Sequence, residues 1–156
     1  MLRIAIRDLQ RGAVETSGEL PANDPAFAGL DLSLEGPVAV EGALQAADGE
    51  DFLWRGKIHA LARLNCRRCL AEVEYPIDRH VDVLLTSDPE AAEDPSVYPL
   101  PLEATQVDLG AVVREELALE VPGFVLCRDD CAGLCPKCGA DLNAGPCDCA
   151  RTAEPV

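Results

Sequence analysis

The chain has 156 residues with 48% hydrophobic side chains, which is enough for one domain with a core and a small appendage and excludes two large domains. Its 28 acidic residues outnumber its 13 basic residues, so the formal net charge is -15. This charge excludes a protein that holds nucleic acid through its overall charge, and any contact with nucleic acid must be local.

The first nine residues, MLRIAIRDL, carry charged side chains at Arg3, Arg7 and Asp8 and contain no long apolar run. They match neither a signal peptide nor a membrane-spanning segment. We therefore expect a cytoplasmic protein that has no membrane partner.

Alternation of apolar and polar residues dominates the first two thirds of the chain. Apolar residues recur at alternate positions, as expected for strands with one buried face, in residues 2–6, 30–34, 58–64, 73–77 and 81–85. Glycine and proline separate these segments at 35–37, at 48–51 and at Pro76. The pattern predicts an antiparallel sheet that curls into a small barrel or forms a sandwich.

One stretch within the predicted sheet departs from the acidic background. Residues 52–71 contain no acid, but they hold Trp54 and five of the basic residues, namely Arg55, Lys57, Arg63, Arg67 and Arg68. Arginine suits phosphate contacts and base stacking, so this basic island is a candidate surface for RNA or another partner. The alternative is a solvated charge run whose arginines pair with neighbouring acids such as Glu72 and Glu74.

A loop and then one helix follow the predicted strands. Residues 86–104 hold four prolines and five acids, a composition that predicts irregular structure. The sequence TQVD at 105–108 resembles a capping box, and Leu109, Val112, Val113 and Leu117 then recur at helical spacing. Pro122 and Gly123 end the pattern. We predict a helix over about 106–121 that packs its apolar side on the sheet.

All eight cysteines fall in close pairs: Cys66 with Cys69, Cys127 with Cys131, Cys135 with Cys138, and Cys147 with Cys149. In a reducing cytoplasm, paired thiols of this kind favour metal ligation over disulfides. A tetrahedral zinc site takes four thiolates, and a short turn can direct two of them at one ion. The sequence thus predicts one or two bound zinc ions.

The four pairs can form two sites in three ways, and one grouping is preferred. The C-terminal tetrad, Cys135, Cys138, Cys147 and Cys149, closes a loop of only eight residues between its two pairs. The split tetrad, Cys66, Cys69, Cys127 and Cys131, spans a much longer loop. Because the entropy cost of closure grows only with the logarithm of loop length, an interleaved grouping stays open as an alternative.

Two other chemistries compete with structural zinc. CPKCG at 135–139 also resembles a turn of rubredoxin, which holds iron for electron transfer, and CRRC at 66–69 could form a zinc-thiolate redox sensor. Catalysis has little support, because there is no phosphate-binding glycine loop and no serine in a nucleophile-elbow context. The two histidines, His59 and His80, both fall on predicted strands. We expect no enzyme activity and no small-molecule substrate.

Three segments occur together in an order that resembles a known family. They are CRRCL at 66–70, VDLGAVVREELALEVP at 107–122 and CRDDCAGLCPKCGADLNAGPCDC at 127–149. They resemble the YceD family of large ribosomal RNA subunit accumulation proteins, and Asp108, Leu109, Glu116 and Pro122 match the helix motif of that family. The resemblance implies a non-enzymatic bacterial factor in ribosome biogenesis, needed for normal levels of large-subunit ribosomal RNA.

These observations combine into one expected organisation. We predict an α+β fold, mainly antiparallel β, with one packed helix in residues 1–124, a zinc-binding module in 125–150 and a disordered tail in 151–156. The expected partner is ribosomal RNA or a large-subunit assembly intermediate, reached directly or through another protein. The alternative function is that of the redox sensor or the iron electron carrier.

Overall fold

The computed structural model of the chain describes residues 2–149, and the predicted disordered tail lies outside them. In chain order, the elements are β1 (Arg3–Ala5), α1 (Ile6–Leu9), β2 (Val14–Leu20), η1 (Pro25–Phe27), β3 (Ser33–Leu34), β4 (Val38–Ala46), β5 (Phe52–Asn65), β6 (Glu72–Thr86), η2 (Ala91–Glu93), β7 (Val97–Pro99), β8 (Gln106–Asp108), α2 (Gly110–Glu120) and η3 (Leu142–Ala144). No helix among the described residues is both long and apolar enough to cross a membrane.

Residue contacts divide the chain into two compact units. Unit 1 comprises Met1–Ala62 and Pro76–Val121, and unit 2 comprises Arg63–Tyr75 and Pro122–Val156. Unit 2 therefore contains the end of the hairpin between β5 and β6 as well as the cysteine-rich C-terminal segment. The strands β5 and β6 belong to unit 1 along most of their length and continue into unit 2.

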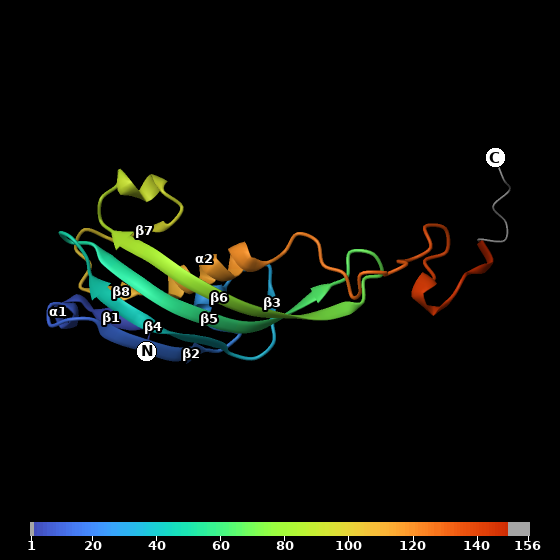
Figure 1. The fold of residues 1–156 in the computed structure, drawn as a ribbon, viewed down its shortest axis with the longest axis horizontal. Coiled ribbons are helices and arrows are strands. Elements are labelled where there is room, and N and C mark those ends of the chain that lie inside the picture. The colour runs from blue at the N-terminus through green and yellow to red at the C-terminus, as the bar shows by residue number, and fades with distance from the viewer. Residues whose placement is uncertain (1, 150–156) are drawn as a thin grey trace. The chain divides into compact units, whose positions relative to one another are not determined.

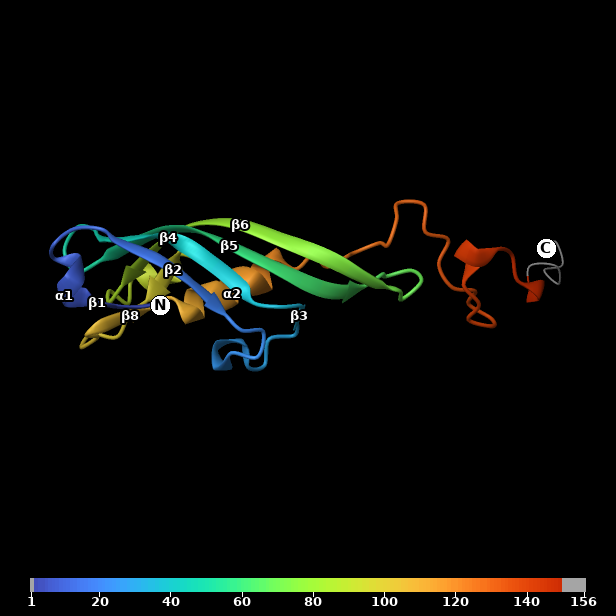
Figure 2. The same cartoon turned by 90° about the horizontal axis from the view of Figure 1, so that it is seen from below.

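The sheet is mixed and open. Its main path runs β2-β4-β5-β6-β7, with β3 paired to β5, while β1 and β8 form a separate two-stranded ladder. The β2–β4 and β4–β5 pairs are antiparallel, and β6 and β7 are parallel. The prediction of a mainly antiparallel sheet is confirmed, but the barrel is wrong, because β2 and β7 remain free edges of the path. In unit 1, α2 covers one face of the sheet (Figures 1 and 2), so the sheet need not close on itself to bury that face.

The core of unit 1 lies between the sheet and α2. The helix buries Val112, Val113 and Leu117, and the sheet buries Ile58 and Trp54, whose exposed fraction is 0%. Trp54 Nε1 donates to Thr16 Oγ1 at 2.9 Å, which pairs the one polar group of the indole inside the core. The helical spacing and the alternation in β5 thus predicted the correct buried faces.

Three local predictions differ from the structure. The strand predicted for 2–6 ends at Ala5, because α1 turns the chain so that Leu9 also enters the core. Of the strand predicted for 30–34, only β3 forms, after the short helical turn η1. The strands predicted for 73–77 and 81–85 are one strand, β6. The part of β6 around Pro76 pairs on one side only, since β7 reaches just Leu84–Thr86, so the missing N–H can face away from the ladder.

The start of the long helix was also predicted incorrectly. The supposed capping box contributes β8, which pairs with β1 in the register Arg3↔Asp108, and α2 begins at Gly110. Leu109 is the N-cap residue, and Asp108 Oδ1 accepts from the Gly110 N–H at 2.9 Å, which satisfies one free N–H at the start of the helix. The other oxygen of Asp108 accepts from Arg3 Nε at 2.8 Å, so the same carboxylate fastens the β1–β8 ladder.

A buried carboxylate anchors α2 in unit 1. Glu116 accepts from Arg79 Nε on β6 and from the hydroxyl of Tyr98 on β7, both at 2.9 Å. Burial, followed by the contact with Glu116, raises the pKa of Tyr98, so that hydroxyl remains a donor at all ordinary pH values. The three side chains connect the helix to two neighbouring strands.

Glu116→Ala is expected to lower the free energy of unfolding by about 2 kcal/mol, because it leaves the Tyr98 hydroxyl unpaired inside the protein. Glu116→Gln keeps the shape and should cost less. Urea unfolding followed by the fluorescence of Trp54, the only tryptophan, measures both values. The matched control is the exposed neighbour Glu115→Gln, and an equal effect at the two positions would contradict the prediction.

Candidate metal centres

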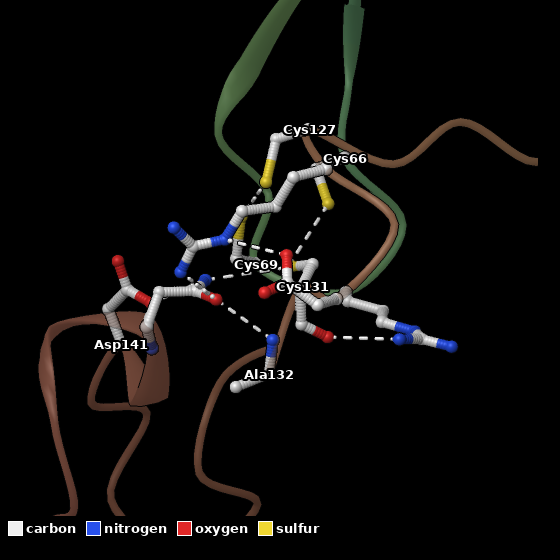
Figure 3. A network of polar contacts seen from close by, with 10 residues as sticks. Cys66, Cys69, Cys127, Cys131, Ala132 and Asp141 are labelled. Carbon is white, nitrogen blue, oxygen red and sulfur yellow. Dashed lines mark hydrogen bonds and ion pairs between the residues drawn. The ribbon is translucent and has the colours of Figure 1, made fainter.

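Unit 2 brings the eight cysteines together in two groups of four. They are the split tetrad, Cys66, Cys69, Cys127 and Cys131, and the C-terminal tetrad, Cys135, Cys138, Cys147 and Cys149. Within each group, the sulfur atoms all lie within 4.8 Å of one another. Figure 3 shows the cysteines of the split tetrad gathered where the hairpin meets the segment that follows α2. This is the grouping that spacing favoured over the interleaved ones.

The distances between sulfurs in the split tetrad fit a tetrahedral ion. Cys66 Sγ lies 3.7 Å from Cys131 Sγ, and Cys69 Sγ lies 3.6 Å from Cys127 Sγ. Zinc–sulfur bonds of about 2.3 Å at tetrahedral angles place neighbouring sulfurs about 3.8 Å apart. The residues present can therefore hold one metal ion in each tetrad, with little movement required in the split tetrad.

The two Cys-x-x-Cys turns have the same backbone design. In the first, the Leu70 N–H donates to the Cys66 carbonyl at 3.0 Å and the Cys66 N–H donates to the Ala71 carbonyl at 2.8 Å. In the second, the corresponding pairs, Gly139 to Cys135 and Cys135 to Ala140, are both 2.8 Å. The sequence predicted a short turn for such cysteine pairs, but only the second turn carries a glycine, Gly139, directly after its cysteines.

Each turn also directs backbone N–H groups at the sulfur of its first cysteine. The N–H of Cys69 lowers the pKa of Cys66 to about 6, and the N–H of Cys138 lowers that of Cys135 to about 6. Such hydrogen bonds stabilise the thiolate, which is the form that binds metal. At two other cysteines a neighbouring sulfur has the opposite effect: Cys69 raises the pKa of Cys127 to about 12, and Cys138 raises that of Cys149 to about 12. Four sulfurs this close need a cation before all can be ionised.

Asn143, on η3 in the loop of the C-terminal tetrad, reaches across to the split tetrad. Its Nδ2 donates to Cys131 Sγ at 3.4 Å, and this contact is the main cause of the lowered pKa of Cys131. Its Oδ1 accepts from the Ala132 N–H at 2.8 Å and from Arg128 Nη2 at 2.7 Å. Figure 3 shows Ala132 and Asp141 beside the cysteines. Sequence reasoning missed this residue, although the D-L-N pattern of an Asx turn was visible.

The cysteines form most of the interior of unit 2. Among its described residues, the buried side chains are those of Cys66, Cys131 and Cys135. One cysteine of each tetrad is exposed, Cys127 in the split tetrad and Cys138 in the C-terminal tetrad. Apolar packing alone therefore gives unit 2 very little stability.

The sequence that contains the two tetrads also identifies the protein family. A family model described as "Large ribosomal RNA subunit accumulation protein YceD" matches residues 54–155, about two thirds of the chain. The chain belongs to the YceD family. The resemblance seen in the three sequence segments is thereby confirmed, and the YceD match includes both tetrads and all five basic residues of the basic island.

The curated relatives include a plant protein that carries the same family name. The chain is 27% identical over 126 residues to "Large ribosomal RNA subunit accumulation protein YCED homolog 1, chloroplastic" of Arabidopsis thaliana, an alignment that covers 62% of this chain and 39% of the plant protein. It is 31% identical over 137 residues to an uncharacterized protein of Mycobacterium tuberculosis strain H37Rv, covering 80% of this chain and 62% of the relative. The chain thus spans about two fifths to three fifths of the length of these relatives. No solved structure gives a significant match.

The basic island within the YceD match is divided between the two units. Arg55 and Lys57 lie in unit 1, and Arg55 Nε is 3.1 Å from the Asp82 carboxylate. Arg63 lies in unit 2, where its Nη1 is 3.6 Å from the Glu72 carboxylate. For these two arginines, the structure shows the pairing with neighbouring acids that was the alternative interpretation.

Arg67 and Arg68, between the first two cysteines, behave differently from each other. A turn that directs both cysteine sulfurs at one metal ion is expected to project the two side chains between them away from that ion. Arg68 Nη1 instead donates to the Cys131 carbonyl at 3.0 Å, which ties the turn to the second half of the split tetrad. Arg67 is exposed and makes no ion pair with any of the residues 2–149. Of the two arginines in the Cys66–Cys69 turn, Arg67 is the one whose side chain is available to a partner.

Proposed function

We propose that this chain is a non-enzymatic cytoplasmic factor that supports accumulation of large-subunit ribosomal RNA during ribosome assembly. The observation that carries the proposal is the YceD family match over residues 54–155, which includes all eight cysteines of unit 2. The plant relatives that the chain matches in Arabidopsis and in Zea mays are named for large ribosomal RNA subunit accumulation. The partner we propose is ribosomal RNA or a large-subunit precursor particle.

We further propose that both tetrads hold structural zinc. The sulfur distances in the split tetrad, the N–H groups directed at Cys66 and Cys135, and the lack of other buried side chains among the described residues of unit 2 support this assignment. When bound, zinc joins four thiolates and supplies the folding energy that apolar burial does not. A set of four thiolates leaves no open coordination position, which agrees with a factor that does no chemistry.

Exposure of the cysteines favours a structural role over a redox sensor. A sensor needs accessible thiolates, whereas each tetrad exposes a single cysteine, Cys127 or Cys138. Cys66, Cys131 and Cys135 are buried and the remaining three are partly covered. Oxidation would have to begin at one exposed sulfur per site.

Deletion of the gene in its native host is expected to lower the ratio of large-subunit to small-subunit ribosomal RNA, because large-subunit RNA would no longer accumulate normally. Total RNA electrophoresis and sucrose-gradient profiles of the subunits measure this ratio. A plasmid copy of the gene should restore it, and a copy with a premature stop codon is the control. An unchanged ratio and a normal subunit profile in the deletion strain would overturn the proposed function.

A further inference from the structure

Leu70 adopts a backbone conformation that disfavours leucine. Its φ is 64°, and every other described residue with positive φ is a glycine. Gly139 occupies the corresponding position in the second Cys-x-x-Cys turn, with φ 74° and the same backbone hydrogen bonds. The turn therefore does not require a side chain here, and glycine would be favoured by the backbone. The leucine gains little from burial in return, because it is 61% exposed.

A second exposed apolar side chain lies beside Leu70. Phe124 is also 61% exposed, and the two residues line a groove of about 470 Å³ in unit 2. The Arg67 N–H donates to the Val125 carbonyl at 2.8 Å, so the segment that carries Phe124 is fixed against the Cys66–Cys69 turn. The aromatic ring and the leucine thus form one preformed surface on hydrogen-bonded backbone.

Among the described residues that line the groove, Arg67 is the one with a charged side chain. The acids of the chain are concentrated elsewhere: unit 1 holds 21 acidic and seven basic residues, and unit 2 holds seven and six, which together make the 28 and 13 of the whole chain. Each filled tetrad would carry a net charge of -2, so unit 2 would reach a formal charge of about -5, which is still far less negative than the -14 of unit 1. An anion therefore meets less repulsion at this groove than on unit 1.

We propose that this groove binds a nucleotide of single-stranded ribosomal RNA, with the base against Phe124 and Leu70 and the phosphate against Arg67. The proposal rests on the proposed function and deepens it. An aromatic face, an apolar neighbour and an unpaired arginine match the two parts of a nucleotide, because every base has a flat stacking face beside an anionic backbone. A purely apolar peptide would leave Arg67 without a counter-charge.

The test is fluorescence anisotropy of the zinc-loaded full chain with a short unstructured RNA oligonucleotide, and with duplex RNA of equal length. Phe124→Leu keeps the apolar bulk but removes the aromatic ring, and it is expected to weaken binding of the single strand about ten-fold. Leu70→Gly should weaken binding while the melting temperature stays equal or rises, since glycine relieves the positive φ. Arg67→Gln should weaken binding and reduce its dependence on salt.

The matched control is Leu119→Ala on α2, a leucine of unit 1 that is also well exposed, and it should leave RNA affinity unchanged. Wild-type affinity in Phe124→Leu, or no preference of the wild type for the single strand, overturns the proposal. If Phe124→Leu keeps co-sedimenting with large-subunit precursors while Leu70→Gly does not, the groove binds an apolar protein segment and the proposal is also wrong. None of these results alters the ribosomal RNA ratio of the deletion strain, which tests the proposed function separately.

Discussion

Replacing Cys135 by serine is expected to unfold the C-terminal part of unit 2 while unit 1 stays folded. The substitution removes one of the few buried side chains of unit 2 and one of the four thiolates of the C-terminal tetrad. Structural zinc contributes about 10 to 16 kcal/mol to the folding of small metal modules, so its loss exceeds anything that the remaining apolar contacts can offset. A strong chelator should have the same effect on the wild type.

Two kinds of measurement report on the folding of unit 1 and of unit 2 separately in the Cys135→Ser variant. Trp54 lies in the core of unit 1, so its fluorescence should be unchanged, while hydrogen exchange and proteolysis should show lost protection in the C-terminal segment. Metal analysis should find two zinc ions in the wild type and fewer in the variant. Lys137→Ala is the matched control, since it changes the same turn without removing a sulfur. Unchanged protection of the segment in Cys135→Ser, or a red iron-loaded native protein, would contradict structural zinc.

Changing Asn143 to aspartate is expected to weaken metal binding at the split tetrad by about ten-fold to a hundred-fold. The aspartate can still accept from the Ala132 N–H, but it cannot donate to Cys131 Sγ and would place a carboxylate beside the thiolates. Stepwise competition with a chromophoric chelator should show one zinc ion lost early and one retained. Asn143→Ala, which adds no charge, should give a smaller effect in the same direction.

Asn23→Asp in unit 1 makes the same chemical change on an exposed surface and serves as the control, with both zinc ions bound as in the wild type. If Asn143→Asp retains two zinc ions of wild-type affinity, the amide does not support the split tetrad. The prediction concerns a residue outside both tetrads. Its outcome therefore reports on how the two sites depend on each other, separately from the loss of a ligand.

The sequence was most informative where the relevant partners are close along the chain. The Cys135–Cys138 turn, the buried face of α2 and the alternation in β5 all follow from spacing within a few residues. The grouping of the split tetrad was preferred correctly only because the C-terminal pairs form a complete set by themselves. Local periodicity predicts these features because it shows which face of a helix or strand is apolar.

The incorrect predictions concern residues whose partners lie far away along the chain. Asp108 was assigned to the helix because its role in the β1–β8 ladder depends on Arg3, 105 residues away. The contact between Asn143 and Cys131 depends on how two loops meet, which no spacing rule describes. The open sheet could not be predicted from alternation either, because alternation identifies strands without identifying their neighbours. The positive φ of Leu70 could not be predicted because, unlike glycine, a leucine in the sequence gives no signal of a left-handed turn.

The discontinuous make-up of unit 2 affects the order of events during synthesis. Cys69 precedes Cys127 by 58 residues, and the whole of α2 lies between them. At about 5 to 20 residues per second, the hairpin thiols leave the ribosome several seconds before the thiols that complete their set. The four cysteines of the C-terminal tetrad, in contrast, lie within fifteen residues of one another and are translated in quick succession. The split tetrad can therefore be completed around zinc only after all of unit 1 has been translated, and a filled split tetrad marks a nascent chain that has been extended beyond Cys131.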